Sequence, residues 1–281
     1  MTTADAPAGE VTVTQRLLDS AAARDGRTAL AGGTASPAYT YPGLAVLLQR
    51  AAAGLAWRGV RPRDVVGVYV DDAAAYIVAC HAVRAAGGVP SPVCPHTPVI
   101  EAAGQLADCG ARILITTQSL AALALAAADR SWVRQVISFG EAPGATPFAA
   151  LLNLGTMRPH QVRAHDLALL PYARRHDGTL GQAGVTHLDL SARLLALCTD
   201  AGLTECDVVL AAPPAGDKLA YTAYVDHALL RGALVVAAAP GELPAAARAH
   251  QGTAAIVTPD TDPAGLAGLA GSLRTLTVPW D

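Results

Sequence analysis

Short, continuously apolar runs that alternate with helical segments are the feature that most constrains how this chain can fold. Val65–Val70 (VVGVYV) is one such run, and the stretch before it, Tyr41–Gly59, places apolar residues at helical spacing and ends at a glycine. Strands that are apolar along their whole length must be covered on both faces, so this alternation predicts parallel sheets flanked by helices. The first half of the chain is therefore expected to be α/β.

A second series of the same kind follows a stretch rich in Gly, Pro and polar residues. That stretch, between Gly140 and His165, is typical of a connection between two lobes. After it, the runs DLALLPY, DVVLAA, ALVVAAA, AAIVT and LRTLTV are separated by helical segments, one of them over about Thr186–Ala201. We predict two tandem lobes with mostly parallel sheets flanked by helices: a first lobe over residues 1–150, a connection over 151–165 and a second lobe over 166–281.

Composition and charge exclude several classes of function. Hydrophobic residues make up 52% of the 281 residues and the net charge is −3, so the chain is globular and has no general attraction to nucleic acid or to an anionic membrane. No uncharged apolar run reaches the roughly 18 residues of a membrane span, and no basic segment followed by an apolar core opens the chain. We expect a cytoplasmic protein without nucleic-acid or membrane partners.

No metal site or catalytic group is predicted from residue spacing. The five cysteines are odd in number and include no CxxC pair, which argues against a disulfide framework and a cysteine-rich zinc site. His81 lies among apolar residues, where a core or interface histidine is expected rather than a ligand or base. Asp71 and Asp72 follow the end of a strand, the usual ligand edge of such sheets, but capping of the next helix is the favoured role.

Tyr39–Thr117 resembles the amino-terminal part of the adenylate-forming ligases, which include acyl- and aryl-CoA synthetases, nonribosomal peptide adenylation domains and luciferases. The match lies in YTYPGLAVLLQRAAAGLAWRGVRPRDVVGVYV, AVRAAGGVPSPVCP and QLADCGARILIT, which occur in the family's order and at its spacing. The resemblance continues over nearly the whole chain. It implies the α/β fold of the family's amino-terminal domain in a truncated member that lacks the small barrel and the carboxy-terminal domain.

The phosphate-loop segment, Leu170–His187 (LPYARRHDGTLGQAGVTH), aligns without a gap to the family's phosphate loop, which reads approximately LPYSSGTTGLPKGVMLTH. The matching residues include Tyr172, Gly178, Thr186 and His187. The run of hydroxyl residues and glycines that folds around a triphosphate is replaced, and the lysine is lost. The replacing residues include Arg174, Arg175 and His176.

Each residue of this segment has a structural interpretation beside the functional one. Arg174, Arg175 and His176 could still attract a phosphate or carboxylate, but a drifted surface loop is favoured. Thr186 and His187 open a helix, and Thr is a common N-cap, so folding explains this pair equally well. The resemblance therefore implies a nucleotide site that is non-functional, and no cofactor is expected.

The family's acyl-pocket motif, a proline-aromatic-histidine segment, is also altered. The corresponding residues have neither an aromatic nor a histidine, and the positions expected to contact a substrate are Ala215, Gly216, Asp217 and Lys218. Lys218 is the only lysine of the chain and stands where the family has no catalytic lysine. If a ligand binds, a small apolar acyl or aryl compound held between the lobes is expected.

Three functions remain open at this point. The favoured one is a non-catalytic protein that acts as an accessory or regulatory partner of an intact ligase, a carrier protein or another pathway enzyme. The others are one part of a split acyl- or aryl-acid ligase completed by another chain, and an acyl or aryl sensor. A homodimer or heteromeric complex is expected through the last strand, which would offer an open edge or apolar face, with Leu276 and Trp280 in the interface.

Overall fold

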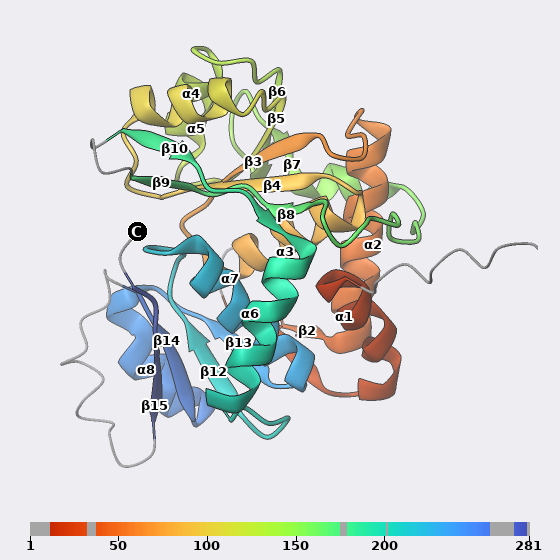
Figure 1. Cartoon of the computed structure of the whole chain (residues 1–281), viewed down its shortest axis with the longest axis vertical. Helices are drawn as coiled ribbons and strands as arrows, with labels where there is room; N and C mark the ends of the chain where they lie inside the picture. Colours follow the sequence, from red (N-terminus) through yellow and green to blue (C-terminus); the bar gives the residue numbers. More distant parts are fainter. Residues whose placement is uncertain (1–11, 33–37, 175–178, 201, 259–272, 280–281) are drawn as a thin grey trace, which may run out of the picture.

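The computed structural model describes residues 12–32, 38–174, 179–200, 202–258 and 273–279 of the chain. Figure 1 shows two sheets, one in the upper and one in the lower half of the view, with helices between and around them. The predicted α/β architecture with two mostly parallel sheets is confirmed. The described residues form no closed barrel.

The first sheet has five parallel strands in the order β4-β3-β5-β6-β7. Its strands are apolar because helices and loops cover them: Val66, Val68 and Leu114 are each no more than 1% exposed. The helix predicted within Tyr41–Gly59 and the strand predicted at Val65–Val70 form at Tyr41–Trp57 and Val65–Tyr69. The elements of this sheet are β3 (Val65–Tyr69), α3 (Ala73–Ala85), β4 (Val89–Val93), α4 (Val99–Asp108), β5 (Ile113–Thr117), α5 (Ala121–Ala128), β6 (Gln135–Phe139) and β7 (Thr146–Pro147).

The second sheet has the order β15-β14-β12-β13-β1-β2, and all of its pairs except β1 with β2 are parallel. Each apolar run predicted after the connection forms a strand. The elements that follow the connection in this half are α6 (His187–Asp200), β12 (Val208–Ala211), α7 (Lys218–Arg231), β13 (Leu234–Ala237), η3 (Pro240–Glu242), α8 (Leu243–His250), β14 (Ala254–Val257) and β15 (Arg274–Thr277).

The start of the chain belongs to the second sheet, which the sequence did not indicate. Leu30 of β1 pairs in parallel with Val235 of β13, and the Tyr41 hydroxyl donates to the carbonyl oxygens of Leu229 and Ala233 at 3.0 and 2.7 Å. Residues 28–40 were predicted to belong to the first lobe, but their strands pair in the second sheet. The parallel partner of β1 is a strand about 200 residues later in the chain. The elements concerned are α1 (Val13–Ala21), η1 (Ala22–Arg24), β1 (Thr28–Ala31), β2 (Tyr39–Thr40) and α2 (Tyr41–Trp57).

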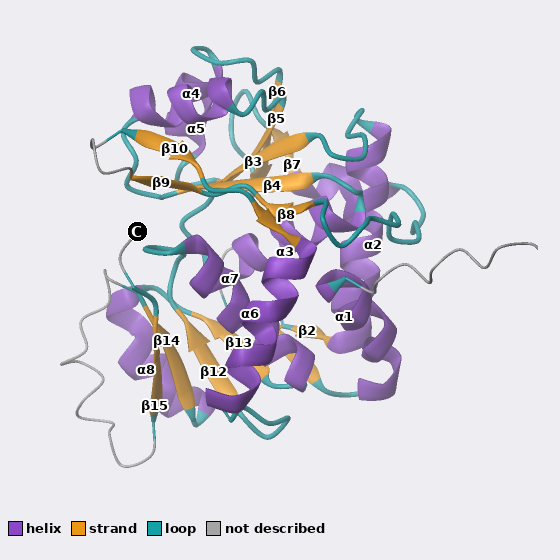
Figure 2. Cartoon of the chain, viewed as in Figure 1, coloured by secondary structure: helices purple, strands orange, loops and turns teal. Residues whose placement is uncertain are grey.

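Helix α3 lies between the two halves and is buried along its whole length. Figure 2 shows it between the sheets, beside α7. The Tyr76 hydroxyl is 2.7 Å from Thr222 Oγ1 of α7, and the Tyr76 and Tyr221 rings meet edge to face. One apolar cluster contains residues of both sheets, so the two halves share a core. No helix of the described residues, α3 included, is long and apolar enough to cross a membrane.

The connection between the halves packs against the first one. Its start, η2 (Phe148–Asn153), lies on α2, where a Cβ on Gly54 would come within 2.4 Å of the Leu151 carbonyl oxygen, so only glycine fits there. Further along, the His160 amide donates to the Ala85 carbonyl at 2.8 Å, and just beyond the connection Asp166 forms an ion pair with Arg63. The connection is therefore held at several points rather than only at its ends.

Strand β15 is the outer strand of the second sheet and pairs only with β14 among the described strands. Leu276 is 7% exposed and belongs to the shared core. Strand β15 therefore does not offer the uncovered apolar face that the sequence suggested, because its inward side is packed against the core. Trp280 lies outside the described residues, and an interface near this strand stays a prediction.

Candidate functional site

The phosphate-loop segment is built from short paired strands. β9 (Tyr172–Arg174) and β10 (Leu180–Gln182) form an antiparallel pair in which Ala173 faces Gly181. β11 (Val185–Thr186) pairs with β8 (Leu167–Leu169). Backbone groups of the described part are thus joined in ladders between strands. Arg175, His176 and Gly178 lie outside the described residues, as does the side chain of Arg174.

Asp108, at the end of α4, fixes both strands of the β9–β10 hairpin. Its Oδ2 accepts from the Tyr172 hydroxyl at 2.5 Å and from Gln182 Nε2 at 2.9 Å. Burial and the hydrogen bond to the Asp108 carboxylate raise the pKa of Tyr172 above its usual value. The contact joins the phosphate-loop segment to a carboxylate, and nothing in the sequence pointed to Asp108 or Gln182.

A pocket of about 570 Å³ lies between α4 and the hairpin. Two of its lining side chains are carboxylates, Glu101 and Asp108, and no described lining side chain is basic. Negative charge at such a surface disfavours a further anion, since like charges repel. The described part of this surface is thus poorly suited to a triphosphate.

Replacing Tyr172 with Phe is expected to lower the free energy of unfolding by about 1.5–3 kcal/mol, because it removes a hydrogen bond to a charged group. Asp108 still accepts a hydrogen bond from Gln182 in this variant, so the loss of stability should stay within that range. Urea unfolding followed by circular dichroism measures it. Tyr224→Phe is the matched control, since no hydrogen bond of the Tyr224 hydroxyl is found in the described structure; equal stabilities of the two variants would contradict the role of the Asp108 contact.

Thr186 and His187 are used to start α6 and to pack it. The Thr186 amide donates to Asp189 Oδ2 at 2.9 Å, and the Asp189 amide donates to Thr186 Oγ1 at 3.1 Å, a reciprocal cap. His187 is 6% exposed, and its burial and the nearby Arg84 lower its pKa to about 4. The structural interpretation of this pair agrees with these contacts.

The segment expected to contact a substrate forms the start of α7. Asp217 caps the helix, with its Oδ1 accepting from the amides of Leu219 and Ala220 at 2.8 and 3.1 Å. Ala215 is 5% exposed and Lys218 only 3%, and Lys218 Nζ donates to the Gly216 carbonyl at 2.5 Å. These side chains are engaged within the protein, so the substrate-contact role stays a prediction.

Asp71 and Asp72 take different roles at the end of β3. Asp72 caps α3, accepting from the Ala75 amide at 2.7 Å, as expected. Asp71 instead accepts from Thr117 Oγ1 at 2.5 Å and from Ser119 Oγ at 2.6 Å. It therefore links the carboxyl ends of β3 and β5 and does not cap a helix.

A buried polar network joins α1, α3 and α7. His81 Nδ1 is 2.9 Å from Thr14 Oγ1 and His81 Nε2 is 3.1 Å from Asp226 Oδ1, while Arg84 Nη1 donates to Asp226 Oδ2 at 3.0 Å. Arg84 Nε also donates to the Ala168 carbonyl at 3.0 Å. All four side chains of the network are no more than 4% exposed. Thr14, His81 and Asp226 are therefore linked as in a catalytic triad but are enclosed in the core, where they do not face a substrate.

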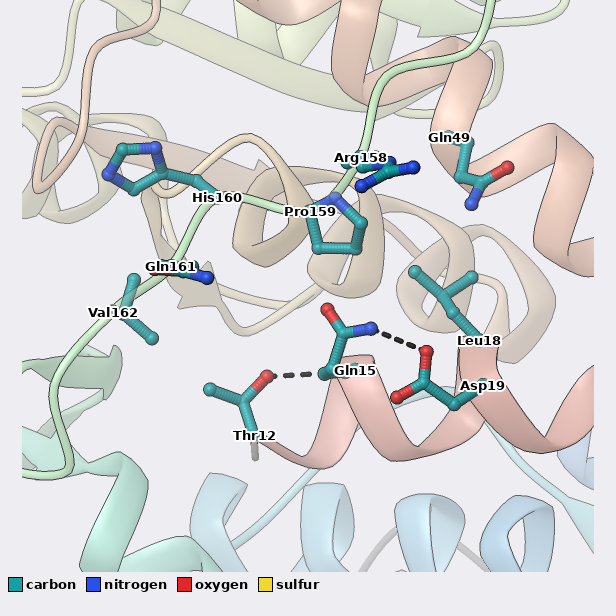
Figure 3. A pocket seen from close by; sticks show the side chains of 10 residues that line it. All are labelled: Thr12, Gln15, Leu18, Asp19, Gln49, Arg158, Pro159, His160, Gln161 and Val162. Carbon is teal, nitrogen blue, oxygen red and sulfur yellow. Dashed lines mark hydrogen bonds between the residues drawn. The ribbon is translucent and has the colours of Figure 1, made fainter. Parts of the chain in front are cut away.

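A pocket of about 510 Å³ lies between α1, α2 and residues 158–162 of the connection (Figure 3). Gln15 Nε2 donates to Asp19 Oδ1 at 2.5 Å on its α1 side, and the other lining residues include apolar ones (Leu18, Pro159, Val162) beside polar ones such as Gln49 and Arg158. These mixed walls do not identify a ligand. The expected acyl or aryl ligand therefore stays a prediction.

No group of three or more His, Cys, Asp or Glu side chains within the described residues could hold a metal ion. The model of the "AMP-binding enzyme" family matches residues 17–261, most of the chain. The chain belongs to this family. The match includes the first sheet, the second sheet apart from β15, and the phosphate-loop segment, so the resemblance seen in the sequence is confirmed.

Proteins of known sequence or structure are similar to this chain over different extents. Gramicidin S synthase 2 of Brevibacillus brevis is 32% identical over 94 residues, which are 34% of this chain and 2% of that protein. The apo structure of Mycobacterium smegmatis MbtA has a TM-score of 0.82 and 25% identity over 94% of this chain. The anthranilate CoA ligase AuaEII, solved with anthranoyl-AMP, has a TM-score of 0.81 and 18% identity over 95% of this chain.

This chain spans about half the length of those solved structures, 51% of MbtA and 52% of AuaEII. The likeness to AuaEII shows the fold alone. For MbtA the identity is a quarter of the aligned residues, which supports the family without fixing a substrate. What these proteins bind or make is therefore carried to this chain only as a proposal.

Proposed function

We propose that this member of the AMP-binding enzyme family does not adenylate a carboxylic acid by itself and acts as an accessory or regulatory binding protein. The observation that carries the proposal is the chemistry of the phosphate-loop segment. It keeps the family's length but has arginines, a histidine and an aspartate in place of hydroxyl residues and glycines, and no lysine. Catalysis of phosphoryl and nucleotidyl transfer depends on positioned groups that stabilise developing charge, and this segment has lost several of them.

The contacts around the segment support the same proposal. Tyr172 and Gln182 are held by the Asp108 carboxylate, and the amides of the described hairpin belong to paired strands. A phosphate cradle needs backbone N–H groups directed at the anion, and small residues that let the backbone approach it. Strand pairing engages amides of the described hairpin, and the sequence from Arg174 to Asp177 has larger side chains where the family has small residues.

Acid-dependent ATP–pyrophosphate exchange tests the first half of the proposal. The purified chain is assayed with aryl, fatty and amino acids, and exchange is expected to stay at the level of a heat-inactivated sample. Melting temperature is measured with and without ATP and magnesium, and any saturable rise is expected to be the same in an Arg174→Ala, Arg175→Ala double variant, because a ligand stabilises in proportion to its occupancy of the folded state and this segment is not expected to hold the nucleotide. Exchange that an Arg174→Ala, Arg175→Ala double variant abolishes and an Arg248→Ala variant retains would refute the proposal.

Purification of the tagged chain from its own cell tests the second half. If an intact ligase accompanies the chain, its turnover is measured with and without added chain, and a change in turnover is the expected result. Exchange that requires both chains, neither being active alone, would instead identify one part of a split ligase. An unchanged turnover would contradict the regulatory role.

A further inference from the structure

A concave surface lies at the edge of the first sheet opposite to the one that holds Asp71. It is a pocket of about 680 Å³ at the amino ends of β3, β5 and β6, which begin at Val65, Ile113 and Gln135. We call it the amino-edge pocket. Open α/β sheets usually place ligands at the carboxyl ends of their strands, so this pocket is separate from the site that the fold would favour.

Three guanidinium groups from three separate segments line the amino-edge pocket. Arg58 follows α2, Arg112 precedes β5 and Arg134 precedes β6; Arg112 and Arg134 are exposed and Arg58 is half-buried. Within the described part of the chain none of the three side chains has a hydrogen bond or an ion pair, and Arg58 lies over the ring of Trp57. Their mutual repulsion is therefore not offset by acidic side chains bound to them.

Asp64 is the carboxylate among the lining residues, and it is already engaged. Its Oδ2 accepts from the Arg61 amide at 2.8 Å. The charged side chains that line the pocket thus have a net positive charge, although the chain as a whole has a net charge of −3. Positive charge concentrated in a concave surface raises the local concentration of anions.

The walls of the amino-edge pocket leave room for a ligand. A Cβ added at Gly59 or Gly110 would meet nothing within 4 Å, so the backbone there is uncovered. The volume falls within the roughly 300–1,000 Å³ of small-molecule sites. A concave site of this size fits a compact anion better than the surface of a folded protein.

We infer that the amino-edge pocket binds a small phosphorylated anion, such as a polyphosphate or phosphate ester, through Arg58, Arg112 and Arg134. Guanidinium groups present planar pairs of N–H donors that match phosphate oxygens, and several together hold a multiply charged anion. The inference does not depend on the proposed function, since it concerns another edge of the protein.

Calorimetric titration of the full chain with inorganic pyrophosphate tests the inference. One saturable site is expected at low ionic strength, with weaker binding at about 0.15 M salt because Arg112 and Arg134 are exposed to the screening ions. Arg112→Gln and Arg134→Gln should each weaken binding about tenfold or more, the effect of losing a charge-assisted hydrogen bond. Arg248→Gln on α8, which removes the same charge elsewhere, should leave affinity unchanged.

Several outcomes would overturn the inference. These are equal affinity of the Arg112 and Arg248 variants, the absence of saturation, and loss of binding in an Arg174→Gln, Arg175→Gln variant while Arg112→Gln binds normally. Citrate and polyglutamate are titrated in parallel. Either of them binding as tightly as pyrophosphate would contradict the preference for phosphate, and preferential binding of polyglutamate would identify the surface as one for an acidic protein.

Discussion

Replacing Asp226 with Ala is expected to destabilise the protein by about 3–5 kcal/mol, because it leaves Arg84 as a buried charge without its partner. Arg84 and Asp226 are 4% and 3% exposed, and their hydrogen-bonded atoms are 3.0 Å apart. Burial alone raises the pKa of Asp226, but Arg84 and His81 more than offset this and hold it below its usual value. The carboxylate is therefore charged in the folded protein, and this charge compensates that of the buried Arg84.

Urea unfolding of Asp226→Ala and of the exposed Asp129→Ala measures this difference, and the latter should be within about 0.5 kcal/mol of the unmodified chain. An Arg84→Met, Asp226→Leu double variant is the sharper test. Replacing a buried ion pair with apolar residues of similar size is often neutral or stabilising, so the double variant should recover most of the loss. A double variant as unstable as Asp226→Ala would show that the two residues do not act as a pair.

Lowering the pH from about 6.5 to about 4 is expected to remove about 3 kcal/mol of stability through His187. Burial and the nearby Arg84 lower the pKa of His187 from 6.5 in the unfolded chain to about 4 in the folded one. The unfolded state then binds a proton in this window and the folded state does not. The stabilisation is fully present above about pH 6.5 and is lost as the pH falls towards 4.

The measurement is a series of urea unfolding curves between pH 4 and 7.5 for the unmodified chain and for His187→Gln. The variant should show a shallower loss of stability over the acidic part of the series. His250→Gln, which replaces an exposed histidine of α8, should follow the unmodified chain. Parallel curves for the unmodified chain and His187→Gln would contradict the lowered pKa.

The order of strands and helices could be predicted from the sequence because a continuous apolar run such as Val65–Val70 has few alternatives to a covered strand. The sheet to which each strand belongs could not be predicted in this way. Leu30 lies early in the chain but pairs with Val235, and this choice depends on tertiary packing of α1 and α2 that local pattern does not encode. Strand pairing between distant segments is decided by the assembled fold.

The candidate site was predictable only where a local motif carried the signal. Thr186 and Asp72 stand at helix starts, and capping explains both from neighbouring residues. Tyr172 and Gln182 both donate to Asp108, which precedes them by 64 and 74 positions, and no local pattern announces such contacts. His81 and Arg84, two ionisable residues within the largely apolar helix α3, were the available signals for the buried network.

Lys218, the sole lysine of the 281 residues, is 3% exposed at the start of α7. Activated acyl groups, whether mixed anhydrides, thioesters or laboratory succinimidyl esters, modify proteins chiefly at ε-amino groups. In its folded form this chain presents no reachable side-chain nitrogen of that kind. The folded protein can therefore be close to an enzyme that releases reactive acyl intermediates without being acylated on a lysine. An acyl group found on Lys218 would identify molecules in which the start of α7 had unfolded.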